Sequence, residues 1–328
     1  MDCCGPTGFD LHGSLELDDV VSREVLTEGL MGSTARHWVR KMPGGDARTV
    51  IVKQACRSPG AATIGLRFDT LGREVLFYEQ VHAAREFAPA CIGVSHRAGG
   101  TVMVLEDTGS TRAAPSVADV QAVITTLAHL QARTILGTPP HATNLLRLFP
   151  PSPGDRSFLV RLGRRGLRHY ARNMSSSASA TTDRAEAVSA AVCNLSDRLP
   201  AGPLALCHGD LRPANVVFRP TGRVTIIDWQ TYRLDLLGVD LACLIGTSLP
   251  PGPRQAAEVE LVENYRTALA SHGVHLDPWP TYHLGALISG LTLFGEWSLL
   301  MAEGRADTVF GEPLHRMLEL MSEAASVS

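Results

Sequence analysis

The stretch that decides the fold is "ALCHGDLRPANVVFRPTGRVTIIDWQ", residues 205–230. Its first apolar run ends in His208 and Asp210, and the short run "VVF" begins directly after Asn215. After a turn sequence, the β-branched run "VTII" ends at Asp228. Two short strands joined by a tight turn would bring Asn215 and Asp228 together, because one precedes the first strand and the other follows the second.

This spacing is typical of a phosphate-transfer loop. A carboxylate and an amide oxygen suit Mg²⁺, which takes one or two protein ligands and fills the rest with phosphates and water. Asp210 lies five residues before Asn215, where its carboxylate can face the same site. Kinase catalytic loops read H-R-D-L-x-x-x-N, and "HGDLRPAN" departs from this only at Gly209. Singly, Asp and Asn are ordinary turn residues, but the eight-residue match favours the loop.

Composition restricts the class of protein. The 328 residues are 45% apolar and 19% charged, which is typical of a globular protein with two lobes. A formal net charge of −3 gives no basis for binding nucleic acid or an anionic membrane. Seven Cys show no CxxC pair, so neither a zinc site nor a disulfide framework is expected.

The chain also has no segment that resembles a targeting signal. "MDCCGPTGFDLHG" lacks the basic and apolar regions of a secretory signal. The apolar segment 282–304 contains His283, Glu296 and several Gly, so it predicts a buried helix, not a membrane span. We therefore expect a cytoplasmic protein.

The hydropathy pattern changes near residue 107. Before it, "EVLTEGLMGSTARHWVRKM", "ARTVIVKQA" and "GGTVMVLEDTG" predict strands, and "TLGREVLFYEQVHAA" predicts one helix. We expect an amino-terminal lobe over residues 1–107, which would bind nucleotide. Residues 108–328 would form a helical lobe for catalysis and acceptor binding, starting with a helix capped by Ser116. Within it, residues 149–172 predict a Pro/Gly-broken segment, followed by the link "SSSASATTD".

The first lobe contains candidate nucleotide contacts. Lys53 is the lone Lys of a β-branched strand, the position of the phosphate-pairing Lys in kinases, and Glu74 in the next helix can pair with it. The alternatives are an edge-strand Lys and a solvated helix face. Gly32 and Ser33 lie in a loop without G-x-G-x-x-G, so a plain hairpin turn is an equal alternative. The hinge would be Glu106, Asp107 and Thr108, whose backbone groups can pair with a purine edge.

Taken together, these motifs resemble those of the aminoglycoside phosphotransferase and choline kinase-like family, which has the protein-kinase-like fold. The landmarks "VIVKQ", "REVLFYEQV", "VMVLEDTG", "LCHGDLRPANVVF", "VTIIDWQ" and "GVDLACL" occur in family order. The resemblance implies an α+β, bilobal fold, with a small β-rich amino-terminal lobe and a larger, mainly helical carboxy-terminal lobe.

The same resemblance implies phosphorylation of a small-molecule hydroxyl by ATP or GTP with Mg²⁺, the acceptor often being an antibiotic. The implied roles are Asp210 as the base, Asn215 and Asp228 as magnesium ligands, Lys53 on the α- and β-phosphates, Glu74 behind Lys53, and Asp240 as a brace for the catalytic loop. Two residues depart from the family pattern. Arg212 stands where many relatives carry His, near the γ-phosphate or the acceptor, and Gln131 replaces another His.

The charged residues that could bind the acceptor suggest two different acceptor classes, one cationic and one anionic. From Trp229 onward, twelve acids oppose five Arg and no Lys, which suits a cationic antibiotic but equally describes solvated acidic helices. Seven Arg between Arg147 and Arg172 would suit an anionic or nucleoside-like group, or a solvated face. Glu296 and Trp297 on the apolar helix are the candidate acceptor contacts, together with Arg212.

Three rival functions remain open on the sequence alone. A catalytically silent nucleotide-binding regulator would explain the irregular glycine loop and Arg212. A metal-dependent hydrolase built on His208, Asp210 and Asp228 would leave Lys53 without a role. A protein kinase is disfavoured because "IDW" replaces D-F-G and no A-P-E follows.

Overall fold

The computed structural model describes residues 19–28, 33–40, 47–54, 68–97, 100–112, 114–135, 153–173, 178–193, 203–302 and 311–327. The chain separates into two compact units. One unit combines Met1–Ser110 with Thr225–Gln230, and the other combines Thr111–Val224 with Thr231–Ser328. The expected boundary after residue 107 falls near the first division, but the pattern along the chain did not predict that a distant hexapeptide joins the first unit.

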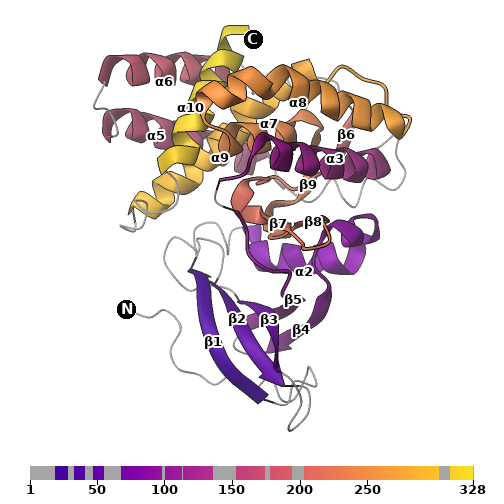
Figure 1. Cartoon of the computed structure of the whole chain (residues 1–328). Helices are drawn as coiled ribbons and strands as arrows, with labels where there is room; N and C mark the ends of the chain where they lie inside the picture. Colours follow the sequence, from indigo (N-terminus) through magenta and orange to yellow (C-terminus); the bar gives the residue numbers. More distant parts are fainter. Residues whose placement is uncertain are drawn as a thin grey trace. The chain divides into compact units, whose positions relative to one another are not determined.

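The first unit is built on an antiparallel five-stranded sheet (Figure 1). Its strands are β1 (Asp19–Glu28), β2 (Ser33–Arg40), β3 (Ala47–Gln54), β4 (Cys91–Arg97) and β5 (Gly100–Glu106), in the order β1-β2-β3-β5-β4. Val52 of β3 lies opposite Val104 of β5, and both belong to a buried valine cluster. This packing explains the β-branched sequence of both strands. No strand was predicted at β4, where Gly and polar residues interrupt the apolar pattern.

One helix, α2 (Thr70–Gln80), completes the core of this unit, and a short 3₁₀ helix, η3 (His82–Phe87), follows it. The ring of Trp229 stacks on Phe77 of α2, with centroids 4.2 Å apart and planes 10° apart. Arg73 Nε, also on α2, donates to the carbonyl oxygen of Gln230 at 3.3 Å. These contacts explain why Thr225–Gln230 belongs to the first unit.

The second unit is mainly helical. Its helices are α3 (Val117–Thr134), α5 (Pro153–Asn173), α6 (Ala178–Cys193), α7 (Gly238–Ser248), α8 (Pro251–Ser271), α9 (Trp279–Ala302) and α10 (Gly311–Val327). As predicted, Ser116 caps α3, and Asp119 completes a capping box. Strand β6 (Leu204–Cys207) pairs antiparallel with β9 (Arg233–Leu236). The 3₁₀ turn η5 (Pro213–Asn215) leads into β7 (Val216–Phe218). The next elements, β8 (Val224–Ile226) and the 3₁₀ turn η6 (Trp229–Thr231), fall mostly in the segment Thr225–Gln230 of the first unit.

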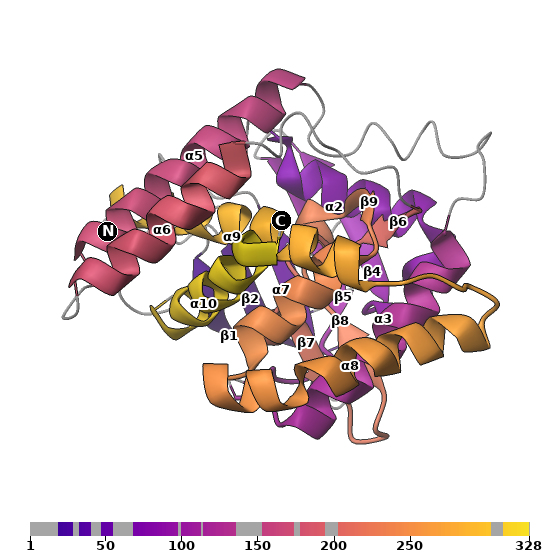
Figure 2. The ribbon, with the colours of Figure 1, turned by 90° about the horizontal axis from the view of Figure 1, so that it is seen from above.

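The segment expected to be broken by Pro and Gly is instead helix α5, and α6 begins inside the expected Ser-rich link. The glycines of α5 serve close packing. A Cβ at Gly163 or Gly166 would collide with the carbonyl oxygens of Leu291 or Phe294 on α9. Helices α5 and α6 also pack side by side (Figure 2). Tertiary packing therefore compensates for the low helix propensity of Gly.

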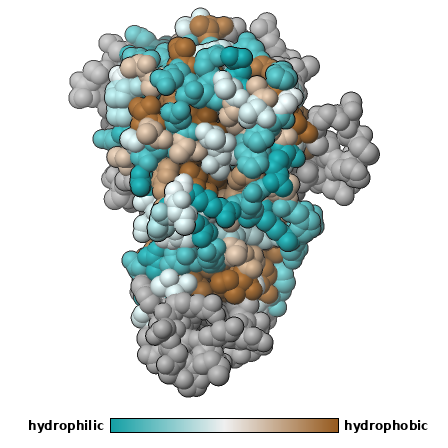
Figure 3. Space-filling view, turned by 45° about the vertical axis from the view of Figure 1, so that its right-hand side comes forward, coloured by the Kyte–Doolittle hydropathy of each residue, from teal (hydrophilic) through white to brown (hydrophobic). Residues whose placement is uncertain are grey.

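Helix α9 is the core helix that its apolar sequence predicts. By length and composition it could cross a membrane, but 67% of its apolar window is buried inside the protein. On the face drawn in Figure 3, polar side chains cover much of the described surface. The large apolar side chains exposed among the described residues are Val25 and Leu26 on β1 and, each on a different element, Leu76, Ile92, Val117, Val259 and Val327.

Candidate active site

The first unit holds a buried cation between two carboxylates. Lys53 Nζ lies 2.8 and 2.9 Å from the two carboxylate oxygens of Glu74 and 2.7 Å from Oδ1 of Asp228. Lys53 is 6% exposed and Glu74 is fully buried. Burial alone would lower the pKa of Lys53, but the charges of Asp228 and Glu74 outweigh it and raise this pKa. The ammonium is thus held charged in a low-dielectric site.

Glu74 is fixed by more than Lys53. It also accepts a hydrogen bond from the backbone N–H of Trp229 at 3.2 Å. Burial raises the pKa of Glu74, against the lowering effect of the Lys53 charge. Asp228 adopts a left-handed backbone with φ 68°, which is uncommon for a residue other than Gly and recurs at functional sites.

The second unit holds the loop "HGDLRPAN". Strand β6 ends at Cys207, and the next two backbone N–H groups, of His208 and Gly209, donate to Asp240 at 2.6 and 2.9 Å. Asp240 is fully buried on α7, and burial raises its pKa although these two N–H groups oppose the shift. The resemblance implied that Asp240 braces this loop, and the hydrogen bonds agree with that role.

Asp210 projects from this loop with its carboxylate held on one side. Its Oδ2 accepts from Arg212 Nε at 3.0 Å and from Asn215 Nδ2 at 2.9 Å. Nδ2 of Asn215 also donates to the carbonyl oxygen of Asp210 at 2.8 Å. Burial alone would lower the pKa of Arg212, but the charges of Asp210 and Glu296 raise it. Asp210, Arg212 and Asn215 therefore form one connected group within the second unit.

A buried arginine under this loop was missed by the sequence analysis. Arg233 of β9 donates from Nε to Asp235 at 2.6 Å and from Nη1 to the carbonyl oxygen of Gly209 at 3.5 Å. Gly209 has φ +85°, and a Cβ there would collide with Arg233. This explains why Gly stands where kinase loops carry Arg. The sequence feature that could have revealed this pair is the spacing of Arg233 and Asp235, because residues two apart on a strand lie on the same face.

The residues predicted to form the hinge begin with Glu106, the last residue of β5. The Glu106 backbone N–H donates to the carbonyl oxygen of Ala90 at 2.8 Å. The Asp107 side chain is paired with Arg36 Nε at 2.6 Å, so only its backbone remains for a ligand. Thr108 is half-buried and follows at the end of the sheet. Gly32 lies outside the described residues, and Ser33 is described only as the first residue of β2.

The candidate acceptor residues on α9 are both buried. Trp297 is 4% exposed and packs edge-on against Tyr170 and His169 of α5, so it is mainly a packing residue. Glu296 is 7% exposed, and its negative charge helps to raise the pKa of Arg212.

The arginine cluster lies on α5 as far as it is described. Its exposed members are Arg161, Arg165, Arg168 and Arg172. Arg164 is half-buried and donates to Ser189 at 3.2 Å. Arg147 and the side chain of Arg156 lie outside the description.

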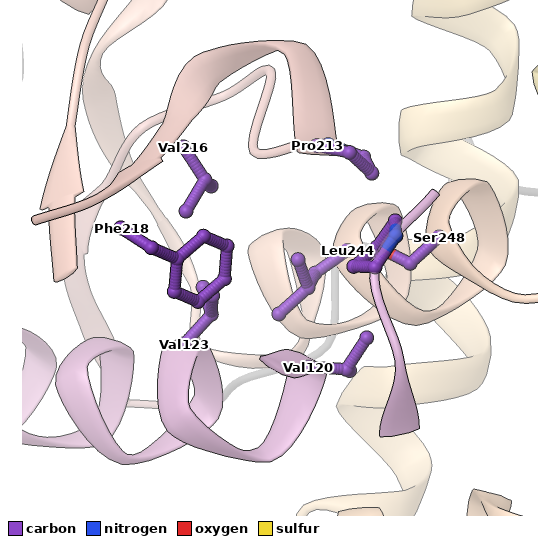
Figure 4. Close-up of a pocket in the computed structure, with 8 residues that line it drawn as sticks. Val120, Val123, Pro213, Val216, Phe218, Leu244 and Ser248 are labelled. Carbon is purple, nitrogen blue, oxygen red and sulfur yellow. The ribbon is translucent and has the colours of Figure 1, made fainter. Parts of the chain in front are cut away.

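A small apolar pocket lies beside the loop in the second unit (Figure 4). It is lined by Pro115 ahead of α3 and by side chains of α3, η5, β7 and α7, namely Val120, Val123, Pro213, Val216, Phe218, Leu244 and Ser248. The described lining holds no charged residue, so this space is where the loop packs on α3 and α7.

The two units thus carry the chemistry of a phosphate-transferring enzyme: a carboxylate on a braced loop, and a buried Lys–Glu pair with an Asp at a strand end. The family model of the phosphotransferase enzyme family, APH, matches residues 45–275. The chain belongs to this family and is a phosphotransferase. No curated protein matches it in sequence.

Solved structures agree on the fold. Spectinomycin phosphotransferase APH(9)-Ia, in complex with ADP and spectinomycin, is 12% identical with a TM-score of 0.59, over 94% of this chain and 93% of that one. The streptomycin–ATP complex of APH(2'')-IIa is 13% identical with a TM-score of 0.54, over 96% of both chains. Choline kinase LicA from Streptococcus pneumoniae is 15% identical with a TM-score of 0.53, over 94% and 95%. The α+β, kinase-like fold is therefore confirmed.

Proposed function

We propose that this phosphotransferase is a small-molecule kinase that transfers the γ-phosphate of ATP to a hydroxyl of an antibiotic. The observation that carries the proposal is the buried Lys53 held between Glu74 and Asp228. A buried ammonium fixed by two carboxylates suits the phosphates of a nucleotide, whereas a structural ion pair needs only one acid. The nucleotide complexes of the spectinomycin and streptomycin enzymes support ATP as the donor.

In this proposal Asp210 is the base. The acceptor hydroxyl gives its proton to the Asp210 carboxylate, and the electron pair of its oxygen forms the bond to the γ-phosphorus. The bond from that phosphorus to the bridging oxygen breaks, and its electrons leave with ADP. Asp240 keeps the loop in place through His208 and Gly209, so that the carboxylate is oriented before the acceptor arrives.

Magnesium fits the ligand set that these residues offer. Both hydrogen bonds of the Asn215 amide use Nδ2, so within the described residues its Oδ1 faces no donor. Asp228 supplies a carboxylate that is one-third exposed. Amide and carboxylate oxygens are the protein ligands that Mg²⁺ takes, and the ion would neutralise charge on the donor phosphates.

The antibiotic class is favoured over choline or ethanolamine by the ion pair at the proposed base. Arg212 lies against Asp210 and places a positive charge beside the base, where a small cationic acceptor such as choline or protonated ethanolamine would be repelled. A large antibiotic can carry its amines away from the reacting hydroxyl.

The experiment is phosphate transfer from ATP and from GTP, with Mg²⁺, to a panel of hydroxyl compounds, followed by the gain in acceptor mass. The panel holds spectinomycin, aminoglycosides, basic peptide and nucleoside antibiotics, macrolides, choline, ethanolamine and simple sugars. We expect one antibiotic to gain a phosphate from ATP. Asp210→Asn should lower its turnover by about 10²- to 10⁴-fold, the usual contribution of a general base.

Two results would contradict the proposal. Unchanged turnover in Asp210→Asn would remove Asp210 from the role of base. Phosphorylation of choline or a sugar, and of no antibiotic, would replace the acceptor class while leaving the kinase assignment intact.

A further inference from the structure

The carboxylate of Asp210 is bound asymmetrically. Both side-chain hydrogen bonds that it accepts, from Arg212 Nε and Asn215 Nδ2, end on Oδ2. Within the part of the chain that the structure describes, Oδ1 accepts none. Asp210 is 4% exposed, so water has little access to replace these two hydrogen bonds. One oxygen is therefore fixed and the other is left to receive a proton.

Arg212 is itself well suited to hold that oxygen. Its backbone is extended, with φ −129° and ψ 165°, and its N–H donates to the carbonyl oxygen of Asp210 at 3.0 Å. Its side chain turns back so that Nε, not a terminal nitrogen, meets Oδ2. The guanidinium is planar and its five N–H donors have a fixed geometry, so a bond through Nε also fixes the plane of the group beside Asp210.

We propose that Arg212 is a positioning residue that acts through Asp210: it holds Oδ2, so that Oδ1 faces the acceptor hydroxyl. This proposal rests on the proposed function, because it takes Asp210 as the base. Arg212 stands where many relatives carry His. In this proposal it orients the base and does not contact the phosphate or the acceptor directly.

The test is a double-mutant cycle between Arg212→Met and Asp210→Asn. Two activities are measured with MgATP. One is phosphorylation of the acceptor that the wild-type enzyme uses, and the other is slow hydrolysis without an acceptor, followed by release of inorganic phosphate. We expect Arg212→Met to lower kcat by about 10- to 100-fold, part of a general base's contribution, with the acceptor KM changed by less than about threefold. In the Asp210→Asn background, the same substitution should cost less than about twofold, because the group it orients is gone.

Two further variants separate positioning from folding. Arg212→Lys keeps the charge but not the planar fork, so it should recover part of kcat. Arg266→Met removes an exposed ion pair with Glu263 on α8 and should leave kcat unchanged. A thermal midpoint of Arg212→Met near that of the wild type would show that the loss of kcat is not a loss of fold.

Each remaining outcome counts against one proposal. An equal loss in both backgrounds, or a raised acceptor KM with unchanged kcat, would show that Arg212 touches the substrates directly and would overturn the positioning role. A raised kcat in Arg212→Met would overturn it too, since the ion pair would then restrain the base. If Asp210→Asn has no residual turnover, the cycle cannot be closed. The positioning role is then tested by whether Arg212→Met lowers kcat without raising the acceptor KM, and by whether Arg212→Lys recovers part of kcat. A wild-type chain that transfers phosphate neither to the panel nor to water would overturn the proposed function itself.

Discussion

At the scale of single residues, the pairing of Lys53 depends on two acids of different character. Glu74 is fully buried and contacts Lys53 with both oxygens, whereas Asp228 contacts it with one oxygen and is one-third exposed. Removing the Glu74 charge would leave Lys53 with Asp228 alone. The ammonium would then neutralise the carboxylate that we assign to magnesium. The contact of Lys53 with the ATP phosphates and the contact of Asp228 with magnesium would both weaken.

We therefore expect Glu74→Gln to raise the Kd for MgATP by about tenfold, equivalent to about 1.4 kcal/mol. Isothermal titration calorimetry measures this directly. Glu79→Gln is the matched control, because Glu79 lies on the same helix and is exposed. An unchanged Kd in Glu74→Gln would show that the Lys53–Glu74 pair serves the fold alone.

At the scale of elements, the contact between α5 and α9 is made by backbones. Gly166 lies so close to α9 that a Cβ would collide with the carbonyl oxygen of Phe294. Overpacking of this kind costs about 1–3 kcal/mol, because helices must shift to relieve it. Gly166→Ala should therefore lower the free energy of unfolding by about that amount in urea denaturation.

The control for this prediction is Gly252→Ala. Gly252 lies in α8 with open space where its Cβ would be. Because Gly252 lies in the first turn of α8 and a methyl group there meets no atom, this variant should be about as stable as the wild type. Equal behaviour of the two variants would refute the close backbone contact.

The same helix shows where sequence reasoning stops. Local patterns predicted β3, α2, the Ser116 cap and the loop with Asp210, because each depends on neighbours in the chain. The glycines of α5 suggested a break, since their partner is a backbone more than a hundred residues away. Arg233 was missed for a related reason: its contact with Gly209 depends on the pairing of β6 with β9. The roles of the site residues stay predictions until variants are measured.

At the scale of the whole molecule, the donor site should be visible in stability. A ligand that binds only the folded state stabilises it by about 2.7 kcal/mol at a concentration near 100 times Kd. The proposed site draws on segments far apart in the sequence, because Lys53 and Asp228 are 175 residues apart and belong to the same unit. Nucleotide binding should therefore raise the thermal midpoint of the chain and not merely order one loop.

We expect MgATP to raise this midpoint by several degrees, given about 2–4 °C per kcal/mol for large domains. EDTA should remove most of the shift, because the phosphates would then lack the Mg²⁺ for which we propose Asp228 as a ligand. Asp228→Asn should lose it even with Mg²⁺ present, while Asp277→Asn, on an exposed turn before α9, should keep it. Differential scanning fluorimetry measures all four samples together. A shift that survives both EDTA and Asp228→Asn would mean that the nucleotide binds without the proposed magnesium ligand.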